Sequence, residues 1–229
     1  MADDLANPIA FIAADDACGC EMIPRPAWLA PLSDPRNEPI LMAAFQVFVD
    51  KGFAGATMLE IATCARVSKE TIYDRFENKD GLFYALLAWA GRQTGVNAAE
   101  YTDAMIEADP IAALKRFGVA TWLKMTRQEA IDITRVAFGE ASRSLEVAVE
   151  FQNLVTASAL EVLPRIAAAL NAQGKARIDD PEAFYHGYIG LLKGCLHQSI
   201  LLGAAPIQPE DEAEAWALRA MDRLLRAFS

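Results

Sequence analysis

Five polar side chains able to form hydrogen bonds lie within six residues of one another in the first third of the chain. They are Ser68, Lys69, Glu70, Thr71 and Tyr73. Hydroxyl, ammonium and carboxylate groups of this kind donate and accept hydrogen bonds at neutral pH. The chain holds two histidines and has no glycine-rich phosphate loop, Gly-x-Ser-x-Gly elbow or His-Glu-x-x-His motif. The pattern therefore favours recognition over catalysis, and we expect no enzyme activity.

The four cysteines, Cys18, Cys20, Cys64 and Cys195, lack the spacing of a zinc site or of a disulfide framework. Reduced thiols are the expectation. The Cys18-Gly-Cys20 pair can be interpreted as a redox pair, as a metal clip or as two exposed thiols. We expect no metal and no cofactor.

Two short helices must position the polar cluster. Thr57–Glu60 has the Thr-x-x-Glu form of a capping box, which begins a helix that runs to about Arg66. Ser68 can cap a second helix that ends near Phe76, with Ile72 and Phe76 facing inward at i and i+4. Two short helices joined by a tight turn form a helix-turn-helix.

Further helices are predicted on both sides of this motif. An apolar face with helical spacing begins at Pro39, and Gly52 is expected to end that helix as its C-cap. Asn78 caps a fourth helix. Residues 1–35 contain five prolines without a sustained helical period and are interpreted as a flexible arm.

These residues together resemble the DNA-binding domain of the TetR family of transcriptional regulators. The segments that carry the resemblance are Ile40–Phe45, Lys51–Phe53, Thr57–Ala62, Val67–Tyr73, Phe76 and Asn78–Phe83. The resemblance implies an all-α fold, with a three-helix helix-turn-helix DNA-binding domain over residues 36–83. A helical ligand-binding and dimerisation domain would then occupy residues 84–229.

The resemblance also implies which side chains contact DNA. They are Thr57, Ser68, Lys69, Glu70, Thr71, Tyr73 and Lys79. Thr57 and Tyr73 would donate hydroxyl hydrogen bonds to phosphate, as would Lys79 together with backbone amides at the start of the fourth helix. The residues at the start of the recognition helix would lie nearest the bases, where Glu70 can accept from a cytosine amino group and Lys69 can donate to guanine or phosphate.

Each role has a structural alternative. Thr57 and Ser68 are explained as helix caps without any DNA, and Lys79 as a solvated charge. Tyr73 favours a functional role, because Ile72 and Phe76 already fill the inward positions of its helix.

The charge balance limits how this surface can bind. The chain has a formal net charge of −10, and residues 36–83 hold six basic and seven acidic side chains. A nearly neutral domain predicts specific binding by a few well-placed cations, with weak nonspecific affinity and a modest salt dependence.

The rest of the chain is predicted to be helical. Caps and stops give helices over about 110–125, 128–142, 145–171, 182–202 and 209–228. Pro164 should kink or split the third of these, while Gly174 and Gly203 should end the third and the fourth.

The segments Ile178–Ala183, Gly187–Gly194 and His197–Gly203 are similar to the C-terminal region of AefR-like TetR regulators. That similarity implies a homodimer in which the last two helices pair across a two-fold axis as a four-helix bundle. The small residues Gly187, Gly190 and Gly194 would permit close approach there, or alternatively close packing inside one subunit. A dimer would present two recognition helices to a palindromic operator.

An apolar effector site is expected among the C-terminal helices. The candidate lining residues are Trp89, Phe117, Trp122, Met125, Phe138, Phe151, Phe184 and Tyr188, with His186 or His197 as a polar anchor. Aromatic residues at helical spacing are also typical of ordinary core. In the family, a ligand that moves the fourth helix changes the separation of the recognition helices.

The expected function is thus a sequence-specific transcriptional regulator, with repression released by a small molecule. The alternative is a helical dimeric interaction or sensor module that has no DNA binding. The acidic start at Asp3 and Asp4 and the lack of a long uninterrupted apolar run predict a cytoplasmic protein without membrane association.

Overall fold

The computed structural model describes residues 34–94, 96–141 and 144–229, and all regular structure in these ranges is helical. The elements are η2 (Pro35–Asn37), α1 (Glu38–Gly55), α2 (Met58–Ala65), α3 (Lys69–Phe76), α4 (Lys79–Thr94), η3 (Ala98–Glu100), α5 (Asp103–Ala108), α6 (Pro110–Met125), α7 (Gln128–Ala141), α8 (Leu145–Ala172), α9 (Pro181–Leu201) and α10 (Glu210–Ala227). The all-α prediction is confirmed. The arm predicted over residues 1–35 lies almost wholly outside the described residues.

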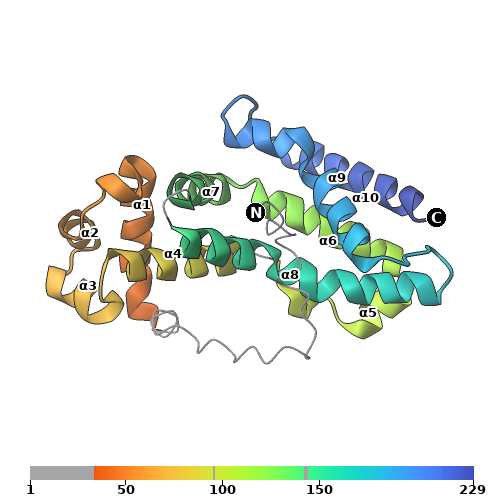
Figure 1. Cartoon of the computed structure of the whole chain (residues 1–229), viewed down its shortest axis with the longest axis horizontal. Coiled ribbons are helices and arrows are strands. Elements are labelled where there is room, and N and C mark those ends of the chain that lie inside the picture. The colour runs from red at the N-terminus through yellow and green to blue at the C-terminus, as the bar shows by residue number, and fades with distance from the viewer. Residues whose placement is uncertain (1–33, 95, 142–143) are drawn as a thin grey trace, which may run out of the picture.

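The molecule is elongated (Figure 1). Helices α1, α2 and α3 form one end, and α5, α6, α9 and α10 form the other. Helix α4 leads from the first end toward the second, and it packs on α1, α3, α7 and α8. Any movement of α4 therefore involves α1 and α3 at the first end and also α7 and α8.

Most helix boundaries follow the capping residues that the sequence offers. The Thr57 hydroxyl accepts from the Glu60 amide at 3.2 Å, and the Glu60 carboxylate accepts from the Thr57 amide at 3.1 Å, which completes the capping box. Asn78 caps α4 through the Gly81 amide at 2.8 Å. Asp109 and Asp180 begin α6 and α9 in the same way.

The predicted stop at Gly52 is confirmed, because helical dihedral angles are interrupted there, where φ is 70°, and a separate turn follows to Gly55. The short helix α5, capped by Thr102, was not predicted, because six residues are too few to show a helical period. Pro164 was expected to kink or split α8, and the helix is not split there. Pro164 is exposed, so water can hydrogen-bond the carbonyl oxygen that has no amide partner.

Two hydrophobic clusters hold the fold together. One joins α1–α4 to α7 and α8, and the other joins α5–α10. In the first cluster, the ring centroids of Phe48 and Phe83 lie 5.3 Å apart and those of Phe53 and Phe83 lie 5.0 Å apart. Such aromatic pairs contribute about 0.5–1.5 kcal/mol each beyond area burial, and they fix α4 against α1. The boundary proposed between residues 83 and 84 falls inside α4.

Helix α8 contains a segment, Val147–Ala172, that is long and apolar enough to cross a membrane by length and composition. Val162, Ile166 and Leu170 on this helix are buried in the α5–α10 cluster. A core helix meets the same length and composition criterion, and the packing of α8 identifies it as one.

Candidate functional site

The outward face of α3 carries the polar side chains that the sequence singled out. Ser68, Lys69, Glu70 and Tyr73 are exposed, and Thr71 is half-buried. The inward face holds Ile72 and Phe76, which are buried as predicted. The Tyr73 side chain is 41% exposed, and its hydroxyl makes no hydrogen bond to any residue that the structure describes. It is free to donate to a phosphate.

The two capping hydroxyls are already engaged. Ser68 accepts from the Thr71 amide at 3.1 Å and shares a 3.0 Å hydrogen bond with the Thr71 hydroxyl. The Thr57 hydroxyl donates to the Glu60 carboxylate at 2.9 Å, so a phosphate contact would need that hydrogen to turn away from Glu60. The capping roles stand, and DNA contacts by these hydroxyls stay predictions.

Glu70 is held as an anion. Hydrogen bonds from its own backbone amide and from the Ser68 hydroxyl lower the pKa of its carboxyl. An ionised carboxylate only accepts hydrogen bonds, which is the chemistry that a cytosine amino group requires.

Lys79 is placed differently from the free cation that the sequence suggested. Its ammonium donates to the carbonyl oxygens of Phe53 at 2.8 Å and Ala56 at 3.1 Å, and it lies 4.5 Å from the centroid of the Phe53 ring. An ammonium has three hydrogens, so one remains for a phosphate. Lys79 therefore ties the start of α4 to the end of α1 whether or not DNA is bound.

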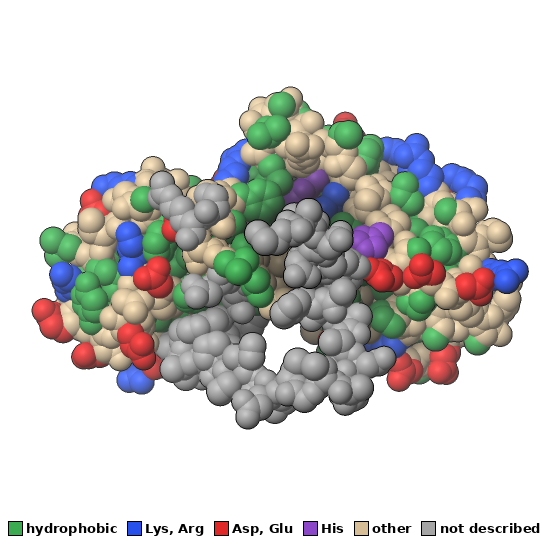
Figure 2. All heavy atoms as spheres, viewed as in Figure 1, with side chains coloured by type: hydrophobic (Ala, Val, Ile, Leu, Met, Phe, Trp, Pro, Cys, Tyr) green, Lys and Arg blue, Asp and Glu red, His purple; other side chains and the backbone are tan. Residues whose placement is uncertain are grey.

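Most other cations of this end of the molecule are also paired. Arg36 pairs with Asp34 at 2.7 Å, Lys51 pairs with Glu60 at 2.5 Å, and Arg75 bonds Asn37. On the part of this end that Figure 2 shows in colour, acidic and basic side chains are interspersed. Residues 36–83 are thus nearly neutral in net charge, and most of their individual cations also have partners.

Two cations beside α3 are exceptions. Lys69 lies over the Tyr73 ring, 5.4 Å from its centroid, and makes no ion pair within the described part of the chain. The exposed side chain of Arg66 makes neither a hydrogen bond nor an ion pair there. Arg66 was missed in the sequence because it was assigned only to the end of a helix. Its position two residues before the predicted cap Ser68 is the sequence signal that could have found it, and in the structure it is the C-cap of α2 with φ at 57°.

A cavity of about 440 Å³ lies between α4, α6, α7, α8 and α9. Its mouth is marked by Phe138 and Val155, which are 59% and 44% exposed. The volume is typical of pockets for small organic ligands.

The cavity brings together four of the predicted ligand residues. Met125, Phe138, Phe151 and His197 line it. The others are placed elsewhere: Phe117, Trp122 and Tyr188 are buried core, Trp89 packs against the α1–α4 cluster, and Phe184 lines a smaller apolar cavity of about 190 Å³ between α8 and α9. His186 is exposed beside Glu182, with 3.7 Å between His186 Nε2 and a Glu182 carboxylate oxygen. Whether the four lining residues bind a ligand stays a prediction.

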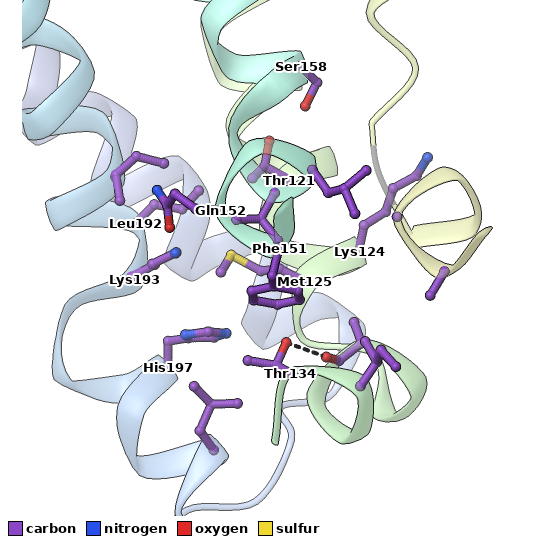
Figure 3. Close-up of a pocket in the computed structure, with 18 of the residues that line it drawn as sticks. Thr121, Lys124, Met125, Thr134, Phe151, Gln152, Ser158, Leu192, Lys193 and His197 are labelled. Carbon is purple, nitrogen blue, oxygen red and sulfur yellow. Dashed lines mark hydrogen bonds between the residues drawn. The ribbon is translucent and has the colours of Figure 1, made fainter. Parts of the chain in front are cut away.

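The sequence reasoning missed the polar part of the lining. It consists of Thr121, Lys124, Thr134, Gln152, Ser158, Lys193 and Gln198. Figure 3 shows Lys193 and His197 of α9 pointing into the same space as Gln152 and Phe151 of α8. A single lysine inside the apolar run Gly190–Gly194 was the available signal for Lys193.

Burial shifts the two basic groups of α9 toward their neutral forms. Desolvation lowers the pKa of His197 to about 4, assisted by the charge of Lys193. Desolvation also lowers the pKa of the Lys193 ammonium. Among the side chains that the structure describes, no aspartate or glutamate lines the cavity.

Helix α4 connects the cavity to the α3 surface. Leu87, Ala90 and Gly91 line the cavity, and the first residue of the same helix, Lys79, is bonded to the end of α1. At 1.5 Å per residue, Lys79 lies about 12 Å from Leu87 and about 18 Å from Gly91 along the helix. Helix α4 thus packs against the exposed polar helix α3 and also lines a ligand-sized cavity. This arrangement is the architecture of a ligand-responsive DNA-binding protein.

Comparison with known proteins agrees with this architecture. Residues 40–86 match the tetR family of bacterial regulatory proteins, and residues 112–229 match the C-terminal domain of AefR-like transcriptional repressors. The chain belongs to the TetR family of transcriptional regulators. Members of this family are cytoplasmic proteins that bind DNA operators and small-molecule effectors and form dimers.

Individual relatives cover the chain to different extents. The transcriptional repressor NicS of Pseudomonas putida is 30% identical over 165 residues, which are 71% of this chain and 75% of NicS. The uncharacterised regulator YvkB of Bacillus subtilis is 34% identical over 113 residues, 49% of this chain and 56% of YvkB. A TetR regulator structure from Agrobacterium tumefaciens, 25% identical, superposes with a TM-score of 0.70 over 85% of this chain and 94% of that one.

Proposed function

We propose that this chain binds a palindromic operator as a homodimer, and that an apolar small molecule in the α4–α9 cavity releases it from DNA. The observation that carries the proposal is the shared helix: α4 lines the cavity at Leu87, Ala90 and Gly91 and packs against α1 and α3 with its first half. A ligand that favours one position of α4 would shift the population between DNA-competent and DNA-incompetent states.

The proposed DNA-contacting residues differ in whether their polar groups already form hydrogen bonds within the protein. Tyr73, Lys69 and the added candidate Arg66 are exposed and have no competing hydrogen bond within the described residues. One hydrogen of the Lys79 ammonium remains for a phosphate. The hydroxyls of Thr57, Ser68 and Thr71 are already hydrogen-bonded at the starts of α2 and α3. We expect Glu70 to read a base, because its acceptor chemistry opposes phosphate contact.

The proposed dimer interface is formed by α9 and α10. Two of the three α9 glycines are required by the structure of a single subunit. A Cβ on Gly187 would lie 2.9 Å from the Leu224 side chain, and Gly194 adopts a φ of 46°. Gly190 has neither reason, since it is exposed and an added Cβ would meet nothing within 4 Å. A surface glycine costs about 1 kcal/mol of helix propensity, and close approach by a second subunit is a reason to retain it.

The interface has a direct test. Gly190→Leu is expected to weaken the dimer, as measured by sedimentation velocity over a range of concentrations. Gly139→Leu is the matched control, because Gly139 is also an exposed helical glycine without neighbours and lies on α7. Equal dimer strength in both variants would place the interface elsewhere.

Repression is proposed as the direction of control because the matched C-terminal domain and NicS are both described as repressors. We propose a cytoplasmic location for the same chain, as for its family. A reporter placed behind the selected operator would report the direction: expression should fall when the protein is present.

The central experiment is a selection of bound sequences from a random DNA pool at fixed salt. The wild type should enrich a palindrome, and Tyr73→Phe should lose most of the enrichment by removing one hydroxyl. Tyr101→Phe, which removes one hydroxyl from a buried side chain outside α3, the cavity and the proposed α9–α10 interface, is the control and should enrich the same palindrome. No enrichment by a folded dimer at low salt would favour the dimeric interaction or sensor module instead.

A further inference from the structure

Lys193 lies at the wall of the α4–α9 cavity and has no partner among the described residues. Its side chain is partly buried next to the fully buried Leu192 and points into the cavity (Figure 3). It makes no hydrogen bond or ion pair with any residue that the structure describes. Holding an ammonium in such a place is unfavourable unless something compensates its charge, which is why burial lowers the pKa of Lys193.

The rest of the lining does not supply that compensation. The ionisable groups that line the cavity in the described part of the chain are Lys124, Lys193 and His197, all of them basic. The whole chain, by contrast, has 31 acidic against 21 basic residues. The described lining, with bases and without acids, is therefore opposite in charge to the chain as a whole, and it is complementary to an anion.

The remaining wall is apolar. Met125, Ile133, Phe151 and Leu154 from three helices line the cavity beside Lys193. An occupant must bury apolar surface against these side chains and place its charge at one end only. An inorganic anion alone would leave the apolar wall facing water.

The backbone around Lys193 is fixed from outside the cavity. Helix α9 is broken at Gly194, where φ is 46° and ψ is −157°. The indole of Trp216 on α10 donates to the carbonyl oxygen of Leu192 at 2.9 Å, which satisfies a backbone group beside the break. Lys193 is thus presented by a backbone that is already bonded in place, so little ordering is needed when an anion binds.

We infer that the effector is an amphipathic anion, an apolar molecule with one carboxylate-like group that pairs with Lys193. His197 lies on the same wall, but its ring is neutral above about pH 4 and is already hydrogen-bonded to the Met125 backbone, so the pairing with the anion is assigned to Lys193. This inference rests on the proposed effector cavity and adds the chemical class of its ligand. The apolar body supplies binding to the wall, and the anion supplies selectivity over neutral molecules of the same shape.

The test uses probes that differ only in the head group. N-phenyl-1-naphthylamine, a neutral fluorescent reporter of apolar cavities, is bound first and is then displaced by decanoate, decanamide or decylammonium. With the wild type, decanoate should displace the reporter at a concentration about 10- to 100-fold lower than decanamide, and decylammonium should be the weakest. This range corresponds to one charge-assisted hydrogen bond.

Variants assign the selectivity to one residue. Lys193→Met keeps a chain of similar shape without the charge and should bring decanoate and decanamide to equal displacement, while Lys193→Arg should retain the preference. Lys175→Met, a lysine outside the cavity with an ion pair to Asp109, is the matched control and should behave as wild type. Thermal unfolding followed by circular dichroism verifies that each variant is folded.

The outcomes separate this inference from the proposed function. Reporter and decanamide binding without an advantage for decanoate, or an advantage that survives Lys193→Met, would overturn the inference and leave the cavity in place. Failure of the reporter to bind would overturn the cavity, and both proposals with it.

Discussion

The Lys79 ammonium at the start of α4 donates a 2.8 Å hydrogen bond to the Phe53 carbonyl oxygen near the end of α1. A second bond, to Ala56, and the contact with the Phe53 ring complete the attachment. One side chain therefore joins the helix that lines the cavity to the helix on which α2 packs. This attachment is a candidate element for transmitting ligand binding to the DNA-binding end.

The first prediction concerns this attachment. Lys79→Met should lower the free energy of unfolding by about 1.5–3 kcal/mol, because two carbonyl oxygens lose a charged donor. Urea unfolding at neutral pH measures it. Lys69→Met is the control, since Lys69 is exposed and should change stability by less than about 0.5 kcal/mol. Equal stability of the two variants would show that Lys79 is a solvated charge, the alternative that the sequence left open.

A second prediction concerns the contact between α3 and α4. A Cβ on Gly81 would lie 2.3 Å from the Phe76 carbonyl oxygen, which is backbone and cannot yield without moving a helix. Gly81→Ala should therefore destabilise the protein by about 2 kcal/mol or more and lower the affinity for the selected operator.

The control for this change is another helical glycine. Gly139→Ala meets nothing within 4 Å and should raise stability by about 0.5–1 kcal/mol through helix propensity alone. Thermal unfolding of the two variants should thus shift in opposite directions. A shift in the same direction would contradict the close approach at Gly81.

A third prediction concerns the few available cations. Lys69→Met should weaken operator binding and reduce the slope of log affinity against log salt by about 1 per subunit, because one phosphate contact is lost. Lys51→Met should leave the slope nearly unchanged, since Lys51 is paired with Glu60 at 2.5 Å. Fluorescence anisotropy over a series of salt concentrations distinguishes them, and the reverse ranking would show that Lys69 faces away from DNA.

The sequence predicted most of the N-terminal elements, because their signals are local. The capping box at Thr57, the caps at Ser68 and Asn78 and the inward pair Ile72 and Phe76 depend on residues within four positions of one another. Local hydrogen bonds and helical spacing leave few alternatives there. The same holds for Asp109, which begins α6.

The cavity could not be predicted in the same way, because it depends on how five helices pack. Large apolar residues such as Phe117 and Met125 have similar helical patterns, yet one is core and the other lines the cavity. Lys79 shows the same limit, since its partners lie 26 and 23 residues earlier in the chain. Contacts between segments that are far apart in the sequence determine both the lining of the cavity and the partners of Lys79.

The fourth prediction concerns His197, which is buried in the cavity wall beside Trp122, with 6.1 Å between ring centroids. Burial and the nearby Lys193 charge lower its pKa to about 4 from the ordinary value of 6.5. Between these two pH values the unfolded chain binds a proton that the folded protein does not bind. The free energy of unfolding must therefore fall as the pH falls from 6.5 to about 4, and His197 adds no further loss below that range.

Urea unfolding at pH 7.0 and pH 5.0 measures this effect. Carboxylates contribute to the same loss in every variant, so the comparison between variants isolates the histidine. His197→Gln should lose less stability than the wild type between the two pH values, whereas His186→Gln, at an exposed position, should lose as much as the wild type. If His197→Gln is as pH-sensitive as the wild type, then His197 titrates normally in the folded protein, and the cavity wall around it must be more open to water than its burial indicates.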